Sequence, residues 1–180
     1  FHTWNITKRP GGLSWQNLFY AAPFAAPGAL ALAGLLGLGA AHLPRIRFAA
    51  PLKRKQLAAA LAWTMSASLM VTASEMWVLH FRGAFHDVFM VLPVTLPPIA
   101  GLAILGRVSD RLTRLLLRAT LWLGFAGVGF HALGVARNMG GWRNWTQNLL
   151  NGPPLPAPPS FTALALAGLA ALDLPKSPEA

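Results

Sequence analysis

The chain has 180 residues, of which 54% are hydrophobic and 11% are charged, with a formal net charge of +10. A soluble domain carries about 25% charged residues, so this composition excludes an ordinary soluble protein and favours a membrane protein. The chain has no cysteine, which excludes disulfides, thiolate metal sites, cysteine-held iron–sulfur clusters and c-type haem.

The hydrophobic runs predict the elements in chain order. Residues 1–20 are expected to form an amphipathic, tryptophan-containing segment on the outer membrane face. Four runs approach the ~20 residues that a helix needs to cross a bilayer, and a fifth is shorter. These runs are 21–42, 57–80, 88–106, 115–136 and the short 161–174, with an outer Trp/Pro loop at 137–160 and a cytoplasmic tail at 175–180. We therefore expect an all-α integral membrane protein, a helical bundle of four clear and one short transmembrane helices.

Basic residues set the expected orientation. Ten of the fifteen lie on one side of the membrane: Arg45, Arg47, Lys53, Arg54, Lys55, Arg107, Arg111, Arg114, Arg118 and Lys176. The other five are Lys8, Arg9, Arg82, Arg137 and Arg143. Because cytoplasmic loops carry the excess of Lys and Arg, the tryptophan-rich side should face outward, into the periplasm if the membrane is a bacterial inner membrane. The net charge then reflects topology, and nucleic-acid binding is not expected.

Several short sequences occur twice. Phe1-His2 and Gly11-Gly12 match Phe130-His131 and Gly140-Gly141 at an offset of 129. Further matches are Trp15 with Trp145, Gln16-Asn17-Leu18 with Gln147-Asn148-Leu149, LALAGL at 30–35 with 164–169, and HLPR at 42–45 with DLPK at 173–176. They predict a parallel internal repeat with a unit of four helices, related by an axis along the membrane normal. Since Phe130-His131 ends an apolar helix, we expect one or more helices to precede Phe1.

The outer loop after Arg137 combines a helix stop with interfacial side chains. A Gly-Gly pair just beyond a basic helix end is typical of a helix C-terminus. Indole rings favour the membrane–water interface. Backbone groups of the loop are expected to be satisfied by Asn144, Gln147 and Asn148, and a stiff arm that re-enters the bilayer is expected from Pro153, Pro154, Pro156, Pro158 and Pro159.

Two interpretations of this loop remain open. It is either a rigid outer cap with no further function, or a docking surface for an extracytoplasmic partner. In the second case Trp15, Trp142 and Trp145 would anchor the partner, because buried aromatic side chains dominate many protein interfaces.

Four of the five histidines map to the outer half of the membrane: His2, His80, His86 and His131. A b-type haem needs two imidazoles at similar depth on different helices. The repeat places His2 and His131 at equal depth, whereas the depths of His80 and His131 differ by roughly 6 Å on helical rise. His80 or His86 could substitute as a ligand, and propionates could be held by Arg82, Arg137 or Arg143. The alternative is that each histidine donates to a neighbouring carbonyl and orders the outer helix ends.

The stretch HFRGAFHDVFM, residues 80–90, contains a candidate metal site. His86 and Met90 are spaced i and i+4, and with His80 and Asp87 they could form a copper-like site of imidazole and thioether ligands. In the alternative interpretation Met90 is an ordinary membrane core residue, and Asp87 is a carboxylate at a helix N-terminus.

Two features inside the spans suggest function. Glu75 is the one carboxylate well inside a span, which is typical of a proton- or quinone-binding group, although a pair with Arg82 or an outer histidine is an equal alternative. The third span contains Pro93, Pro97 and Pro98, which remove donors and should break the helix ladder. This break could be a hinge, a ligand-facing site or a static kink.

These residues support three hypotheses of function. The first is a membrane subunit of a redox or energy-converting complex that anchors an extracytoplasmic partner, carries haem b and exchanges electrons with quinone. The second is a cofactor-free structural or assembly subunit that binds other subunits through its Trp/Pro loops. The third is a small transporter that uses Glu75 and the proline-containing span.

Overall fold

The computed structural model describes residues 2–20, 31–32, 34, 51–106 and 108–174, and every regular element in these ranges is a helix. In chain order they are α1 (His2–Thr7), α2 (Trp15–Phe19), α4 (Pro51–Arg82), the 3-10 turn η1 (Val88–Val91), α5 (Leu92–Leu105), α6 (Asp110–Arg137), the 3-10 turn η2 (Gly141–Asn144), α7 (Trp145–Asn151) and α8 (Pro159–Asp173).

Three helical stretches of the described chain are long and apolar enough to cross a membrane. They are Lys55–Arg82, Val88–Leu105 and Asp110–Arg137, at the positions of the second, third and fourth predicted spans. The first predicted span, 21–42, lies outside the described residues except for Ala31, Leu32 and Gly34. α8 has 15 residues and is therefore about 22 Å long, shorter than the hydrocarbon layer.

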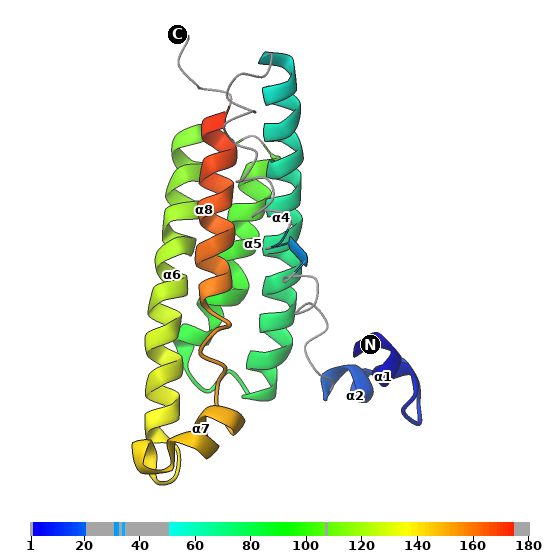
Figure 1. Cartoon of the computed structure of the whole chain (residues 1–180), viewed down its shortest axis with the longest axis vertical. Coiled ribbons are helices and arrows are strands. Elements are labelled where there is room, and N and C mark those ends of the chain that lie inside the picture. Colours follow the sequence, from blue (N-terminus) through cyan, green and yellow to red (C-terminus); the bar gives the residue numbers. More distant parts are fainter. Residues whose placement is uncertain (1, 21–30, 33, 35–50, 107, 175–180) are drawn as a thin grey trace.

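The four longest helices form a bundle in which α4 packs on α5 and α8, and α6 packs on the same two helices (Figure 1). α4 and α6 therefore occupy opposite corners. Figure 1 also shows α1, α2 and α7 at one end of the bundle, which we call the aromatic end. The start of α4 and the end of α8 lie at the opposite end, which we call the basic end.

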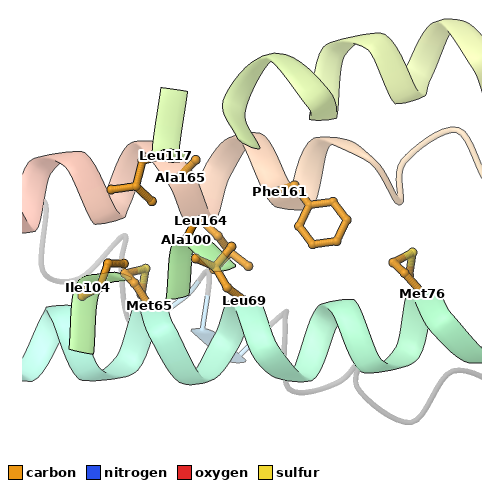
Figure 2. Packing of buried hydrophobic residues seen from close by; sticks show 9 residues of the cluster. All are labelled: Met65, Leu69, Met76, Ala100, Ile104, Leu117, Phe161, Leu164 and Ala165. Carbon is orange, nitrogen blue, oxygen red and sulfur yellow. The ribbon is translucent and has the colours of Figure 1, made fainter. Parts of the chain in front are cut away.

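The centre of the bundle is a cluster of side chains from all four helices (Figure 2). Its most completely buried members include Met65 and Leu69 of α4, Ala100 of α5, Leu117 of α6 and Ala165 of α8. Lipid tails are as apolar as these side chains, so close packing and interhelical hydrogen bonds provide the stabilisation within a membrane.

One such hydrogen bond joins α4 to α5. The Ser66 hydroxyl donates to the carbonyl of Gly101 over 2.8 Å in the buried interior. A Cβ atom at Gly101 would lie only 3.2 Å from the Ser66 carbonyl oxygen. The absence of a side chain at Gly101 therefore allows the two helices to approach closely.

α6 presents a row of three glycines, Gly124, Gly127 and Gly134, to the C-terminal part of the chain. A Cβ atom at Gly124 would overlap the Thr162 hydroxyl of α8, and Cβ atoms at Gly127 and Gly134 would meet the rings of Pro158 and Pro153. We call residues 153–158 the proline arm. It connects α7 to α8 and packs against α6 along this row.

The proline arm is not uniformly extended as the sequence suggested. It contains a turn in which the Ala157 N–H donates to the Pro154 carbonyl over 3.1 Å. Four of its six residues are proline, so most of its backbone carries no N–H that would need a partner at membrane depth. This composition makes an irregular segment tolerable beside a membrane helix.

The prolines of α5 also differ from expectation. The helix continues from Leu92 to Leu105 with Pro97 and Pro98 inside it, so the donors are missing but the helix itself is not interrupted. Pro93 lies in the first turn, where an N–H has no helical partner in any case.

At the basic end, an arginine links α6 to the end of α8. The Arg114 guanidinium contacts Asp110 over 3.1 Å and Asp173 over 2.7 Å, and it donates to the Leu172 carbonyl over 3.4 Å. These contacts join the C-terminal turn of α8 to the first turns of α6.

Candidate functional site

The candidate site begins with the turn that follows α4. Ala84 and Phe85 have φ angles of 56° and 45°, a left-handed conformation that non-glycine residues seldom adopt. The turn is held by hydrogen bonds from the Ala84 N–H to the Phe81 carbonyl and from the Phe85 N–H to the His80 carbonyl, over 2.9 and 3.1 Å. It reverses the chain between His80 and His86, so both imidazoles lie at the aromatic end.

Three histidines share one hydrogen-bonding pattern. The Nδ1 atoms of His80, His86 and His131 lie 2.8, 2.9 and 2.7 Å from the carbonyl oxygens of Met76, Gly83 and Pro154. A carbonyl can only accept, so a neutral imidazole in this geometry carries its proton on Nδ1. Nε2 then keeps a free lone pair that could bind a metal or the iron of a cofactor, as in many histidine ligands.

His80 lies within electrostatic range of His131 and His86. His80 and His131 belong to α4 and α6, at opposite corners of the bundle. The side chain of His2, the favoured partner of His131 in the sequence, lies outside the described residues.

The candidate propionate-binding arginines lie near the ends of the same helices. Arg82 is the last residue of α4 and Arg137 the last of α6, and both side chains are exposed. The Arg82 guanidinium carbon is 5.4 Å from the centre of the Phe19 ring, so this arginine also contacts α2. Arg143 is exposed in η2.

The metal candidates of residues 80–90 are partly brought together. The Met90 methyl and His86 Nδ1 both lie near Gly83, at 3.5 and 3.8 Å from the position of a Cβ atom there. Asp87 instead caps η1, where its carboxylate accepts from the Phe89 N–H over 2.9 Å, as the alternative interpretation predicted. Within the described part of the chain, no group of three or more His, Cys, Asp or Glu side chains could hold a metal ion.

Glu75 is buried in α4, with 7% of its surface exposed. It precedes Met76 of the central cluster, and it lies about 10 Å along the helix from Arg82. Its carboxyl group therefore lies well inside the span that ends at the aromatic end.

Two glycine pairs at the aromatic end have similar φ angles. Gly11 and Gly12 have φ angles of +89° and +53°, and Gly140 and Gly141 have +82° and +52°. Each pair is followed by a helix that begins with tryptophan, Trp15 of α2 and Trp145 of α7. Both glycine pairs lie beyond the end of the preceding helix: α1 ends at Thr7, and α6 ends at Arg137 with an extended cap at Asn138.

An asparagine fixes each turn in the same manner. The Asn17 side-chain amide donates to the carbonyls of Pro10 and Gly12, both over 2.9 Å. The buried Asn148 donates to those of Met139 and Gly141, over 3.3 and 2.9 Å, and lies 3.4 Å from a third carbonyl, that of Val135. Asn148 was expected to satisfy loop backbone, whereas the role of Asn17 was missed, although the sequence match of Asn17 with Asn148 could have indicated it.

The proposed anchor tryptophans are all accessible. Trp15, Trp142 and Trp145 have 51%, 57% and 56% of their surface exposed. Trp15 also contacts Trp77 of α4, with ring centres 6.3 Å apart, and Trp77 stacks on Phe81 at 5.2 Å. An aromatic cluster thus attaches α2 to the aromatic end of α4.

Between α4 and α5 lies an open pocket of about 250 Å³ that the sequence analysis did not predict. Its lining residues are Met70, Ala73, Ser74, Trp77, Val94 and Pro98. The sequence signal for it was the pair Pro97-Pro98, which we interpreted as a break but did not connect with a residue of the neighbouring helix.

Comparison of the chain with protein-family models, curated proteins and solved structures found no match.

Proposed function

We propose that this chain is an integral membrane subunit of a redox complex and that it holds one b-type haem between His80 and His131. The observation that carries the proposal is the shared state of these imidazoles. Each directs Nδ1 to a backbone carbonyl and keeps Nε2 for a ligand, on two different helices. A backbone carbonyl on Nδ1 fixes the tautomer and makes Nε2 more basic, which strengthens binding to iron.

The surroundings of the two histidines support the same function. Arg82 and Arg137 lie two and six residues further along their helices, so their guanidinium groups are near the membrane surface above the imidazoles. Guanidinium groups bind carboxylates well, and the two propionates of haem b need such partners. In this region the proline arm, and not α8, lies beside α6. The Pro154 carbonyl of the arm fixes the His131 ring through its contact with Nδ1.

We further propose that the aromatic end faces the periplasm of a bacterial inner membrane and docks an extracytoplasmic subunit on Trp15, Trp142 and Trp145. The two turns that carry these indoles have matching glycine angles and matching asparagine contacts. This similarity supports the parallel repeat and supplies two rigid surfaces for one partner. Electrons would pass between that partner and quinone in the bilayer.

The test is a visible spectrum of the gently purified protein, oxidised and then reduced with dithionite. We expect a Soret band and sharp α-bands in the wild type. His80→Ala and His131→Ala should each remove or shift the low-spin bands, because each removes an axial ligand. His86→Ala is the matched control, since its Nδ1 makes the same kind of carbonyl contact on an exposed turn. A flat spectrum from folded, haem-supplemented wild type would refute the haem site.

A cofactor-free assembly subunit is the second candidate, and the exposure of the tryptophans favours it. In that case the histidine contacts only order the helix ends and the proline arm. Partner co-purification separates the two functions. Trp142→Ala with Trp145→Ala should abolish capture in either case, whereas His131→Ala should leave capture unchanged for a scaffold and remove the haem spectrum for a redox subunit.

A further inference from the structure

We propose that the pocket between α4 and α5 binds the ring of a quinol from the bilayer. This inference deepens the proposed function and rests on it for the identity of the ligand. The sequence indicated only Glu75 as a quinone-binding residue, and Glu75 does not line this pocket.

The position of the pocket restricts which ligands can reach it. Ser74 is eight residues before Arg82, the last residue of α4, and so lies about 12 Å below that helix end. Met70 and Trp77, on either side of Ser74, are 38% and 43% exposed on the outer surface of the bundle. The pocket therefore opens toward the hydrocarbon layer, and a ligand must arrive through the lipid.

The size and walls of the pocket favour a single flat ring. Its volume of about 250 Å³ is below the roughly 300–1,000 Å³ of pockets for drug-sized ligands. The indole of Trp77, the ring of Pro98 and the thioether of Met70 give it apolar walls. The stacking of Trp77 on Phe81 and its contact with Trp15 hold the indole wall in place.

Hydrogen bonding decides the oxidation state of the ring. The carbonyl of Val94 would normally accept from the N–H three or four residues later, but these residues are Pro97 and Pro98, which have none. Val94 and Pro98 both line the pocket. This carbonyl is thus an acceptor that the α5 ladder cannot satisfy, at a depth where water is scarce.

The hydroxyl of Ser74 adds a second acceptor. It donates its proton to the Met70 carbonyl over 2.9 Å, so its lone pairs are what it can offer to a ligand. A pocket with two acceptors selects a ligand with hydroxyl donors. A quinol has two hydroxyls on its ring, whereas the oxidised quinone has only acceptors, so the pocket should prefer the reduced form.

The experiment is calorimetric titration of the full chain in nanodiscs under anaerobic conditions, with duroquinol and, separately, duroquinone. We expect duroquinol to bind. Duroquinone should bind more weakly by a factor of about ten or more. Ser74→Leu fills the pocket and removes one acceptor. Pro98→Ala supplies an N–H to the Val94 carbonyl, and it should keep the helix intact. Both variants should weaken duroquinol binding by about tenfold or more.

Ala67→Leu is the matched control, because Ala67 is an exposed residue of α4 outside the pocket lining. It should leave duroquinol binding unchanged. Equal binding of the two oxidation states, equal binding by Pro98→Ala and wild type, or loss of binding in Ala67→Leu would each overturn the proposal. A visible spectrum of the same samples keeps the two proposals separate: duroquinol binding without haem bands refutes the haem site alone, and haem bands without duroquinol binding refute the pocket alone.

Discussion

Toward the basic end α8 packs on α6 and α4 as a regular helix, whereas toward the aromatic end the place beside α6 is taken by the proline arm. The regular part contains the central cluster and ends in the contacts of Arg114 with Asp110 and Asp173. The irregular part contains Pro154, whose carbonyl lies 2.7 Å from Nδ1 of His131. The histidines and the left-handed turns of the molecule also lie toward this end.

This difference separates two ways of satisfying backbone groups along one helical bundle. Helix packing with small residues satisfies the backbone internally and leaves few groups for a ligand. In the proline arm and at the prolines of α5, backbone N–H donors are missing and carbonyl groups are open to other donors. The Pro154 carbonyl, which accepts from the Ala157 N–H, also contacts Nδ1 of His131, and the proposed quinol would provide a donor at Val94.

The largest predicted effect concerns the glycine row that joins the two parts. Gly124→Ala places a Cβ atom against Thr162 and the Pro158 carbonyl, so it should destabilise the fold by about 3 kcal/mol. The control is Gly129→Ala, because no atom lies within 4 Å of a Cβ atom there. Unfolding in mixed micelles measures both. Equal stability of the two variants would mean that α8 does not need the close approach.

The next effect sharpens the comparison of the two glycine turns. Asn148→Ala removes an amide that contacts three carbonyls at a buried site, and Asn17→Ala removes one that contacts two at a more exposed site. We expect a loss of about 2 kcal/mol for Asn148→Ala and less for Asn17→Ala. Hydrogen exchange of the amides after each glycine pair reports the loosening. If the amides after Gly12 exchange as slowly in Asn17→Ala as in the wild type, Asn17 does not hold its turn in the way that Asn148 does.

A smaller effect is expected inside the regular part of the bundle. Ser66→Ala removes the hydrogen bond to the Gly101 carbonyl, and interhelical bonds of this kind contribute about 0.6 kcal/mol in membranes. Thr64→Val is the control, because the Thr64 hydroxyl bonds only within its own helix, to the Ala60 carbonyl. The same unfolding assay should rank Ser66→Ala as the more destabilised variant, and the reverse order would argue against the α4–α5 contact.

The smallest effect is expected at the basic end. Arg114→Gln breaks two ion pairs whose carboxylates are half exposed or more, so its cost should be about 0.5 kcal/mol or less and should shrink as salt is added. Arg111→Gln, on the exposed side of the same helix, controls for the change in charge. If Arg114→Gln destabilised the fold more than Asn148→Ala, the polar contacts of the basic end would contribute more to stability than those of the aromatic end.

The sequence was sufficient to predict the parts of the fold that depend on local composition. Apolar runs located the helices later found as α4, α5 and α6, because a membrane span needs a continuous apolar segment. The cap at Asp87 followed from residue types. The Gly-Gly pair lies just beyond the end of α6, but the helix is capped by Asn138 and Gly140 precedes η2. Contacts between distant segments could not be predicted, since Ser66 with Gly101 or His131 with Pro154 depends on how helices rotate and slide against each other.

The histidines of the candidate site could be named from the sequence, but their role and their pairing stay predictions. Helical rise placed His80 and His131 at different depths and favoured His2, whose side chain lies outside the described residues. The pocket was missed because its lining comes from two helices, and only the tertiary structure places Ser74 beside the segment of Val94 and Pro98.

The shortness of α8 has a consequence for biosynthesis. At 15 residues it lacks the ~20 that act as a self-sufficient insertion signal, and the proline arm before it cannot form a helix to make up the difference. We then expect α8 to insert by packing against the glycine row of α6, after α6 is already in the membrane. A defect in that row should therefore appear first as a failure of α8 to insert, before any loss of the assembled bundle.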